Sequence, residues 1–564
     1  MLSHNLIIGF NLAFDVGVLL ETFPEFIQEI FDAYEEGRFV DVDVLERLGE
    51  ISVDKPAKYA GLNDLSQTYG LGKLNKEGGP RTTYARYLGA DPADYTEEHR
   101  KYALRDGYVT YKVWQRARNR YKKVTLEAVQ SESRHALWLH LCASWGFRTN
   151  PDNLEDLRRA AFENVERLRV EAKENGFIRD DDSKDTKVLK QAVWDAYGEK
   201  PPLAKKGQEL VKKGEPWELK HVATNKVALA DSGDPKLEAF AEYGEWAAVV
   251  NKDLNMLGFG VDHPIHTRYR MAATTRTTSS APNVQNFRRL EGVRECVTPR
   301  PGHCFGMIDV GGLELGTLAQ VIAWNLKSYN MANLINDGVD LHLRAACRLK
   351  GWKYDWAEEH KKDKTVKEWR QFCKIANFGY PGFMGAATLV PYARQQGVRI
   401  TLEQAKDLKK NWAQSLPEAA RYLKWIKTKL NHESGRYDFK IPGSADIFRA
   451  GATIASCANG HFQGLGAQVM KQCGWNLTKE AWTDRSSPLY GVHMWIFIHD
   501  EFGFEIPIGD QHHVMSRARE VMRATLHKRM PHVKLDAEPV AMALWAKDAE
   551  PVFDKKGNLE IWEP

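Results

Sequence analysis

Acidic residues stand at two places where apolar runs of the sequence stop. Asp309 ends the run in His303–Gln320, HCFGMIDVGGLELGTLAQ, and two glycines then allow a sharp turn before apolar residues recur at helical spacing. Asp500 and Glu501 end the run in Val492–Pro507, VHMWIFIHDEFGFEIP, and the alternation after them predicts a returning strand. Carboxylates on neighbouring strand ends could hold two magnesium ions roughly 3.5–4 Å apart. Magnesium is therefore the expected cofactor, although a single acid at a strand end is usually only solvated.

A third stretch, Lys364–Gly385, supplies positive charge. Arg370, Lys374 and Phe378 recur every four residues, which places them on one helix face. Residues 365–368, TVKE, have the pattern of a capping box that would begin this helix. An Arg and a Lys on one face suit a triphosphate, and an aromatic ring one turn further can stack on a base. Such a stripe alone is usually a solvated face, but the three stretches rarely occur together in this order by chance.

The three stretches resemble motifs A, B and C of family A DNA polymerases, particularly the bacteriophage branch. The matching residues are DVGGLEL from Asp309, R-x-x-x-K-x-x-NFG from Arg370, and HDE from His499. Three more stretches are similar to the family's primer–template signature, its D-I-H element and its A-N…Q-G helix. They are Thr275–Phe287, TRTTSSAPNVQNF; Asp340-Leu-His342; and Ala458-Asn459 with Gln463-Gly464. The resemblance covers roughly residues 240–545, with weaker similarity upstream.

The resemblance implies a template-directed DNA polymerase that extends a primer with dNTPs by a two-magnesium mechanism in phage DNA replication. It implies metal binding by Asp309, the Val310 carbonyl and Asp500, with Glu501 as a less certain catalytic acid. Nucleotide binding falls to Arg370, Lys374, Phe378, His342 and Glu314, the last excluding ribose. DNA contacts fall to Arg276, Asn283, Gln285, Arg294, Asn459, Gln463 and His499. The partners are then primer–template DNA and dNTPs, and a processivity factor stays open.

The expected fold class is an α/β and α+β multidomain chain, with an RNase H-like exonuclease remnant before a right-hand palm, fingers and thumb. The expected domains are 1–120, exonuclease-like; 121–250, thumb; 251–345, first part of the palm; 346–440, fingers; and 441–564, second part of the palm. Helical spacing predicts helices at Leu154–Asn175, Glu403–Trp412, Pro417–Leu430 and Phe448–Cys473, the last with Asn459 and Gln463 on one face.

The first 120 residues read as α/β with one acidic motif missing. A strand at Leu6–Phe10 precedes N-x-x-F-D, which ends at Asp15, and Tyr102-x-x-x-Asp106 opens a helix through Trp114. Both motifs resemble the second and third motifs of a 3′–5′ proofreading exonuclease. The family's first motif, D-x-E, should lie upstream, but the first 14 residues contain no acid. Losing two of about four metal ligands should cripple two-metal hydrolysis, so proofreading is doubtful.

Three explanations of this gap stay open: a start codon assigned too late, a strand supplied by a separate polypeptide, or lost proofreading. The remaining sheet would expose an unpaired apolar edge, which is an aggregation liability. This edge favours a missing piece over an evolved deletion.

The nucleotide helix departs from the family pattern. The family reads N-F-x-x-x-Y-G, whereas residues 377–383 read NFGYPGF. Pro381 should end or kink the helix and push Tyr380 out of helical geometry, because proline removes a donor and restricts the residue before it. Gly382 occupies the place of the family's template-stacking Tyr. Tyr380 or Phe383 could substitute for it, and the sequence does not decide between them.

Simpler explanations exist for several candidates. Asn283 can be a turn former, and His342 an ordinary histidine at a helix N-terminus. The Lys-rich segment Lys184–Lys220 can be a solvated loop, although its place before the palm favours thumb lysines that contact duplex phosphates.

Composition excludes other classes of protein. The 564 residues are 43% hydrophobic and 27% charged, as in a soluble globular protein. No apolar run approaches 18 residues and the start lacks a basic segment, so we expect neither a membrane span nor a signal peptide. Seven cysteines without a C-x-x-C pair fit a reducing cytosol, here that of a bacterial host. The net charge of +4 neither supports nor excludes nucleic acid.

Three rival functions remain. A single-subunit RNA polymerase shares the palm, but Glu314 argues against it. A free-standing exonuclease would need the absent D-x-E. A non-catalytic DNA-binding scaffold has no reason to keep the metal acids together with the Arg–Lys–Phe face.

Overall fold

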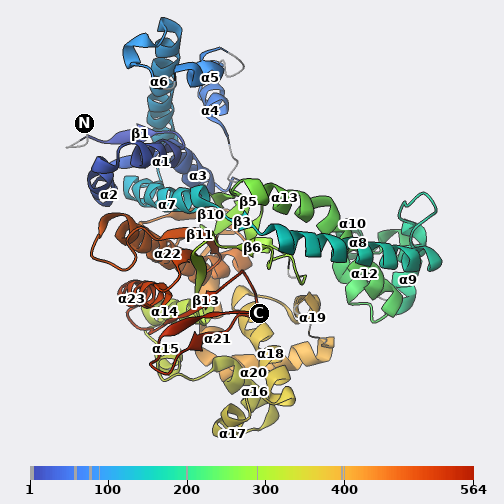
Figure 1. Ribbon diagram of the computed structural model, residues 1–564. Helices are drawn as coiled ribbons and strands as arrows, with labels where there is room; N and C mark the ends of the chain where they lie inside the picture. Colours follow the sequence, from blue (N-terminus) through green and yellow to red (C-terminus); the bar gives the residue numbers. More distant parts are fainter. Residues whose placement is uncertain are drawn as a thin grey trace.

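The computed structural model describes residues 5–564 except 56–59, 75–78, 88, 199, 200, 289, 396, 397 and 399. Its centre is a six-stranded sheet in the order β11-β12-β7-β13-β15-β14 (Figure 1). The strands are β7 (His303–Val310), β11 (His493–Ile498), β12 (Glu501–Pro507), β13 (Ala537–Met542), β14 (Val552–Phe553) and β15 (Leu559–Trp562). Strand β7 pairs antiparallel with both β12 and β13, so it is interior. The mixed α/β fold class is thus confirmed.

The apolar run of β7 is continuous because its two faces pack into two different cores. Cys304, Ile308 and Val310 belong to the large core. Phe305 and Met307 belong to a second core, on the other face of the sheet. Successive side chains of a strand point to opposite faces, so a strand buried on both sides needs apolar residues throughout. Asp309 is the exposed exception near its end.

Three helices pack with the six-stranded sheet: α14 (Leu313–Leu326), α22 (Ile454–Thr483) and α23 (Gln511–Arg529). The prediction of one helix over Phe448–Cys473 is wrong at its start. Phe448–Ala452 forms strand β10 instead, paired with β9 (Arg436–Lys440), which in turn pairs with β8 (Leu430–Asn431). The helix begins only after Thr453, whose hydroxyl accepts the Ser456 backbone N–H as an N-cap.

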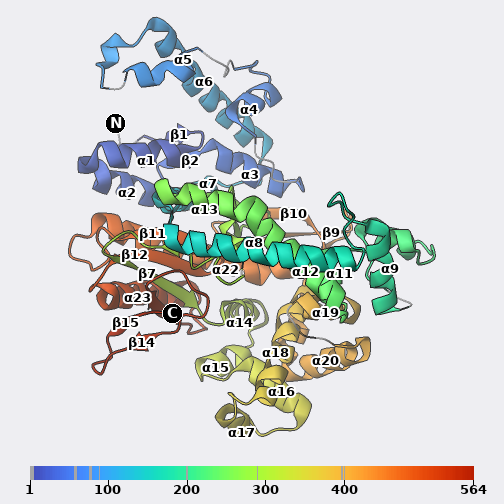
Figure 2. The same cartoon turned by 45° about the vertical axis from the view of Figure 1, so that its right-hand side comes forward.

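A helical arm extends to the right of the six-stranded sheet in Figures 1 and 2. Its helices are α8 (Pro151–Glu174), α9 (Thr186–Tyr197), α10 (Lys205–Lys212), α11 (Lys226–Ala230), α12 (Pro235–Ala248) and α13 (Leu254–Asp262). The helix expected at Leu154–Asn175 is α8, which begins at the Asn150 cap. A small separate core, which includes Phe177, Val193 and Phe240, holds the tip together. Two short strand pairs lie between the arm and the six-stranded sheet. They are β3 (Arg148–Thr149) with β6 (Val297–Thr298), and β4 (Arg268–Met271) with β5 (Thr277–Ser280).

A second helical group follows α14, in the lower part of Figure 1. It comprises α15 (Asn330–Asn336), α16 (Leu341–Lys350), α17 (Tyr354–Glu359), α18 (Lys364–Gly379), α19 (Ala386–Gln395), α20 (Leu402–Ser415) and α21 (Pro417–Lys427). The expected capping box at Thr365 is wrong, because the helix begins one residue earlier, at Lys364, with Asp363 as its extended N-cap. Thr365 therefore lies inside the first turn of the helix and is not its N-cap residue.

The described residues up to Arg120 form a layered unit above the six-stranded sheet in Figure 1. Strands β1 (Ile7–Gly9) and β2 (Phe39–Asp41) pair in parallel as a two-stranded sheet. The helices here are α1 (Leu12–Thr22), α2 (Ile27–Glu35), α3 (Val42–Ser52), α4 (Leu62–Thr68), α5 (Pro80–Thr83) and α6 (Glu97–Arg120). The helix expected to open at Tyr102 in fact starts at Glu97, after the Thr96 cap, and runs six residues past Trp114 to Arg120. Asp41 is buried and accepts the N–H groups of Asn11, Leu12 and Asp43, so it fixes the start of α1.

Helix α7 (Leu126–Trp145) packs against α1 of this unit and is tied to α22 by a buried ion pair. Lys471 of α22 donates to Glu132 at 2.6 Å, and both side chains are under 5% exposed. Gln468 donates to the other Glu132 oxygen at 2.8 Å. Burial raises the pKa of Glu132, but the Lys471 charge and the bonds to this carboxylate outweigh it and hold the pKa well below its usual range. Glu132 therefore stays ionised, and α7 is tied to α22.

We predict that Lys471→Met destabilises the protein by about 3–5 kcal/mol, because it leaves the Glu132 charge buried without its partner. Glu132→Gln in the Lys471→Met background should recover part of the loss. Urea unfolding measures both, and Lys528→Met, at an exposed lysine of α23, is the control.

The ion pair also has a pH signature. In the wild type, the depressed pKa of Glu132 contributes stability above its ordinary value of 4.5, and this contribution is lost as the pH falls. In Lys471→Met the buried acid instead prefers its protonated form, so the destabilisation should shrink toward low pH. Equal effects of Lys471→Met and Lys528→Met at every pH would contradict this assignment.

Candidate active site

The predicted acids meet on adjacent strands at one end of the six-stranded sheet. Asp309 of β7 lies directly opposite Glu501 of β12 in the antiparallel register. Asp500 precedes Glu501 in the two-residue turn between β11 and β12. His499, the other turn residue, has φ 58°, which is the left-handed conformation that a tight hairpin needs but that a non-glycine residue adopts at a cost of about 1 kcal/mol. The turn thus fixes Asp500 beside Asp309.

These carboxylates raise one another's pKa. Burial and the Asp309 charge raise the pKa of Asp500 to about 7, with Arg276 opposing the shift. Burial and the same Asp309 charge raise the pKa of Glu501 to about 7, with Arg294 opposing. Burial also raises the pKa of Asp309, although its side chain is open to solvent, because protein surrounds it on the other sides. A site with this mutual repulsion favours a bound cation.

A further acid was missed by the sequence reasoning. Glu538, at the start of β13, lies opposite Asp309 on the side away from Glu501, and its charge contributes to the raised pKa of Asp309. Its only sequence signal is a position near the start of a short apolar strand late in the chain, which no motif marks. Asp309 therefore has an acidic cross-strand neighbour on each side.

The α18 face turns toward these acids, as expected. The Lys374 charge lowers the pKa of Asp309, and its ammonium lies 5.8 Å from the Phe378 ring centre. Arg370 donates to Asp340 at 2.6 Å, so a neighbouring acid balances this guanidinium. Asp340 also caps α16 by accepting the N–H groups of His342 and Leu343.

His342 is held in a defined state beside this face. Its side chain is buried, its Nδ1 lies 2.9 Å from the Asn377 amide nitrogen, and its ring meets the Phe378 ring edge-on at 5.5 Å. Burial lowers the pKa of His342 to about 4, with Arg370 and Lys374 adding to the effect and Asp340 opposing it. The imidazole is therefore neutral near pH 7, and because the amide N–H donates to Nδ1, its proton sits on Nε2.

Beyond Phe378 the helix ends as predicted, but Tyr380 does not leave helical geometry. Helix α18 stops at Gly379 and a 3₁₀ turn covers Tyr380–Gly382, in which Tyr380 keeps φ −69° and ψ −34°. Tyr380 is 1% exposed and its hydroxyl donates to the Ala405 carbonyl at 2.6 Å. Gly382 packs against Asn459, since a Cβ there would lie 2.5 Å from the Asn459 Oδ1. Phe383, at φ 62°, is half-buried at the end of the turn.

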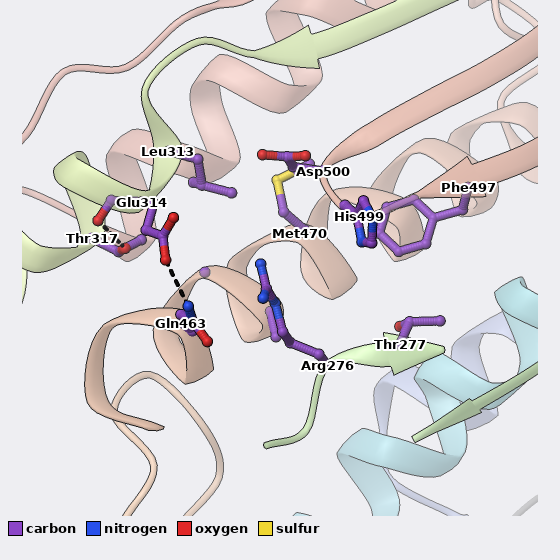
Figure 3. A pocket seen from close by; sticks show the side chains of 12 residues that line it. Arg276, Thr277, Leu313, Glu314, Thr317, Gln463, Met470, Phe497, His499 and Asp500 are labelled. Atoms are coloured by element: carbon purple, nitrogen blue, oxygen red, sulfur yellow. Dashed lines mark hydrogen bonds between the residues drawn. The ribbon is translucent and has the colours of Figure 1, made fainter. Parts of the chain in front are cut away.

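A pocket opens between α14, α22 and the β11–β12 turn (Figure 3). Arg276, Glu314, Gln463, His499 and Asp500 line it together with apolar residues. Gln463 donates through Nε2 to the Glu314 Oε1 at 2.6 Å, and this bond is the dashed line between the two labelled side chains. The structure thus brings five sequence-predicted residues from four segments into one pocket.

Other predicted DNA contacts lie in or near the β4–β5 region and make local bonds. The Asn283 Oδ1 accepts the Ser279 hydroxyl, and Gln285 donates to the Thr277 carbonyl at 3.1 Å. These bonds agree with the turn-forming explanation of Asn283. Arg294 lies over the Trp545 ring at 4.6 Å. Their DNA contacts stay predictions.

The exonuclease-like residues lie on two helices. Asp15 is exposed on α1. Tyr102 and Asp106 lie in the first half of α6, where the Tyr102 ring is 6.4 Å from Tyr84 and the Asp106 charge helps raise the Tyr84 pKa, after burial. Their catalytic role stays a prediction.

The chemistry of the donor set fits magnesium. Asp309, Asp500, Glu501 and the Val310 carbonyl offer only oxygen, which hard divalent cations prefer. Within the described residues, no three His, Cys, Asp or Glu side chains converge into a preformed metal cluster. In the same parts of the chain, none of the helices has the length and apolar character of a membrane span.

An interior carboxylate strand, an acidic hairpin and a cationic helix face define the class of nucleic-acid polymerases with a palm and fingers. The chain matches the family model "DNA polymerase family A" over residues 205–547, more than half its length, and it belongs to that family. It is 25% identical over 309 residues to "DNA polymerase I, thermostable" of Thermus filiformis, covering 51% of this chain. The chain spans about a third of that relative's length, 34%.

A solved structure shares the fold. The POL domain of Pol1 from M. smegmatis, in complex with DNA primer-template and dNTP, superposes with a TM-score of 0.62 at 17% identity. The match covers 90% of this chain and 82% of that one. This likeness extends beyond residues 205–547 and therefore includes parts of the chain that the family model leaves out.

Proposed function

We propose that this protein is a template-directed DNA polymerase that extends a primer 3′ end with dNTPs. The observation that carries the proposal is the cross-strand placement of Asp309 beside Glu501 and Asp500, with Lys374 of the α18 face close enough to act on Asp309. The primer 3′ oxygen attacks the α-phosphate in line, a new phosphodiester bond forms, and pyrophosphate leaves with the electron pair of the broken bond.

The cationic face holds the triphosphate. Arg370 exchanges Asp340 for phosphate oxygens, Lys374 adds a second positive charge, and neutral His342 donates from Nε2. Phe378, one turn beyond Lys374, stacks on the incoming base. Positioning and charge stabilisation of this kind supply most of the catalysis in phosphoryl transfer.

Asp309, Asp500 and the Val310 carbonyl would hold magnesium, with Glu501 as a supporting acid. When bound, two magnesium ions would activate the primer hydroxyl and stabilise the leaving pyrophosphate. Asp500 and Glu501, whose pKa values are raised to about 7, must lose their protons for this. The positive charge of the metal would then offset the repulsion between the ionised carboxylates.

Glu314 selects deoxynucleotides by crowding the sugar 2′ position. Its place in the pocket beside Asp500 supports this role and disfavours a single-subunit RNA polymerase, which must accept ribose. A non-catalytic scaffold has no need of acids whose burial costs energy. Helices α8–α12 of the arm would form the thumb, within the expected limits 121–250. Helices α16–α21 would form the fingers, although α16 begins at Leu341, before the expected limit of residue 346. A role in phage replication inside a bacterial host rests on motif resemblance.

The exonuclease-like unit would be completed by a further strand beside β1, and a separate polypeptide is one source of it. Among the described residues β1 pairs only with β2, which leaves its other edge for strand addition. Next to it, α1 exposes Phe14, Val18 and Leu19 on one face, together with Asp15. An added strand would cover these apolar side chains. A processivity factor is a further possible partner.

Asp500→Asn should reduce primer extension to background, because it removes a metal ligand while keeping the side-chain shape. Binding of the primer–template should stay within about threefold, since phosphate contacts by cations dominate DNA affinity. Asp510→Asn, at an exposed acid beside α23, is the matched control and should extend normally. Gel-based extension and fluorescence anisotropy measure the two quantities; retained extension by Asp500→Asn would refute the proposal.

Phe383, and not Tyr380, is expected to stack on the template base. Phe383→Ala should lower kcat/KM for nucleotide incorporation by roughly tenfold, because base–aromatic stacking contributes about 1–3 kcal/mol. Tyr380→Phe loses only the bond to Ala405, so it should lower stability by about 1 kcal/mol and leave kcat/KM unchanged. Single-nucleotide incorporation kinetics, with thermal unfolding alongside, distinguish the two; the reverse pattern would sink the assignment.

The isolated chain should not trim a 3′-mismatched primer when dNTPs are withheld. Asp41 is used as a helix cap, and too few acids remain around Asp15 and Asp106 for two metals. Denaturing gels of a labelled primer report shortening. Trimming that requires magnesium and disappears in Asp106→Asn would show that the unit is an active exonuclease.

A further inference from the structure

The hydrogen bond between Glu314 and Gln463 joins two helices across the mouth of the pocket. Glu314 lies in the first turn of α14, immediately after the glycine turn that follows Asp309. Gln463 lies in α22, and its Nε2 donates to one carboxylate oxygen of Glu314 at 2.6 Å. Both side chains face the pocket that Asp500 and His499 also line (Figure 3). One oxygen of Glu314 is thus fixed by the palm helix α22.

Without this bond, little else would restrain the Glu314 carboxylate. A glutamate has three rotatable side-chain bonds, and fixing them costs conformational entropy. Two other groups are near enough to feel its charge: Arg276, which lowers the pKa of Glu314, and Tyr392 of α19, whose own pKa Glu314 raises. Of these neighbours, only Gln463 has a described hydrogen bond to it.

The turn after α18 offers no alternative anchor. Gly382 has no side chain, and the position leaves no room for one, since a Cβ would lie 2.5 Å from the Asn459 side chain. The Tyr380 hydroxyl is committed to the Ala405 carbonyl. The Phe383 side chain carries no polar atom. None of these three side chains therefore offers Glu314 a hydrogen bond, whereas Gln463 of α22 makes one.

We propose that Gln463 is a positioning residue that holds Glu314 in the orientation in which its carboxylate excludes a ribose 2′-hydroxyl. This inference rests on the proposed polymerase function and deepens it, because it assigns sugar discrimination to a pair of palm residues. The second N–H and the Oε1 of Gln463 stay available for the DNA minor groove. A single amide then links the primer–template contact to the choice of sugar.

A double-mutant cycle on primer extension tests the pair. The variants are Gln463→Ala, Glu314→Ala and the double variant, each assayed for kcat and KM with dNTPs and with rNTPs. Gln463→Ala should lower the dNTP-to-rNTP ratio of kcat/KM by about tenfold or more, because a hydrogen bond to a charged group is lost. The double variant should discriminate no worse than Glu314→Ala alone, since the amide acts only through the carboxylate.

Two further variants serve as controls for the cycle. Tyr392→Phe removes the neighbouring phenol and should leave the ratio unchanged. Gln463→Asn, one methylene shorter, should restore little, whereas Gln463→His, whose ring N–H can reach a nearby carboxylate, should restore part of the ratio.

The possible outcomes separate this inference from the proposed function. Equal losses with dNTPs and rNTPs in Gln463→Ala, with raised primer–template Kd, would mean that Gln463 only binds DNA and would overturn the proposal. Additive losses in the double variant would do the same. Absence of dNTP extension by the wild type would instead refute the polymerase assignment itself.

Discussion

The pairing of β7 with β12 is the constraint on which the site depends. It sets Asp309 opposite Glu501 and carries Asp500 beside them on a two-residue turn. The assembled carboxylates repel one another: burial, together with the Asp309 charge, raises the pKa values of Asp500 and Glu501. This repulsion is tolerated because the rest of β7 is buried in two cores, one on each face. The same strand thus carries both a continuous apolar run and one of the acids of the site.

The positions at which apolar runs stop at an acid were enough to predict this arrangement from the sequence. A strand buried on both faces is apolar along its length, so an acid marks the place where it reaches solvent or a cation. The α18 face was equally readable, since its period is local. The hairpin was predictable because its pattern is also local. One apolar run stops at His499 and the alternation of Phe502, Phe504 and Ile506 begins just after Glu501, so only a short turn fits between the two strands.

The failures lie where tertiary contacts overrode a local pattern. Residues 448–452 have helical spacing but pair with β9, and Thr453 then supplies a stronger helix start than any residue before it. Tyr380 keeps helical dihedrals before Pro381 because a 3₁₀ turn and a bond to Ala405 hold it there. Glu538 escaped notice because its significance is its register opposite Asp309, and cross-strand register between distant segments has no sequence signature.

The electrostatics also explain how two halves of the site act together. The strand ends carry acids whose ionisation is opposed, and the α18 region carries Arg370 balanced by Asp340 and a histidine kept neutral. The acids thus lack positive charge, and Lys374 is the α18 cation whose charge acts on Asp309. In the proposed reaction, a metal-bound triphosphate would bring positive charge to the acids and negative charge to Arg370 and Lys374 at once. One ligand would then satisfy both halves of the site.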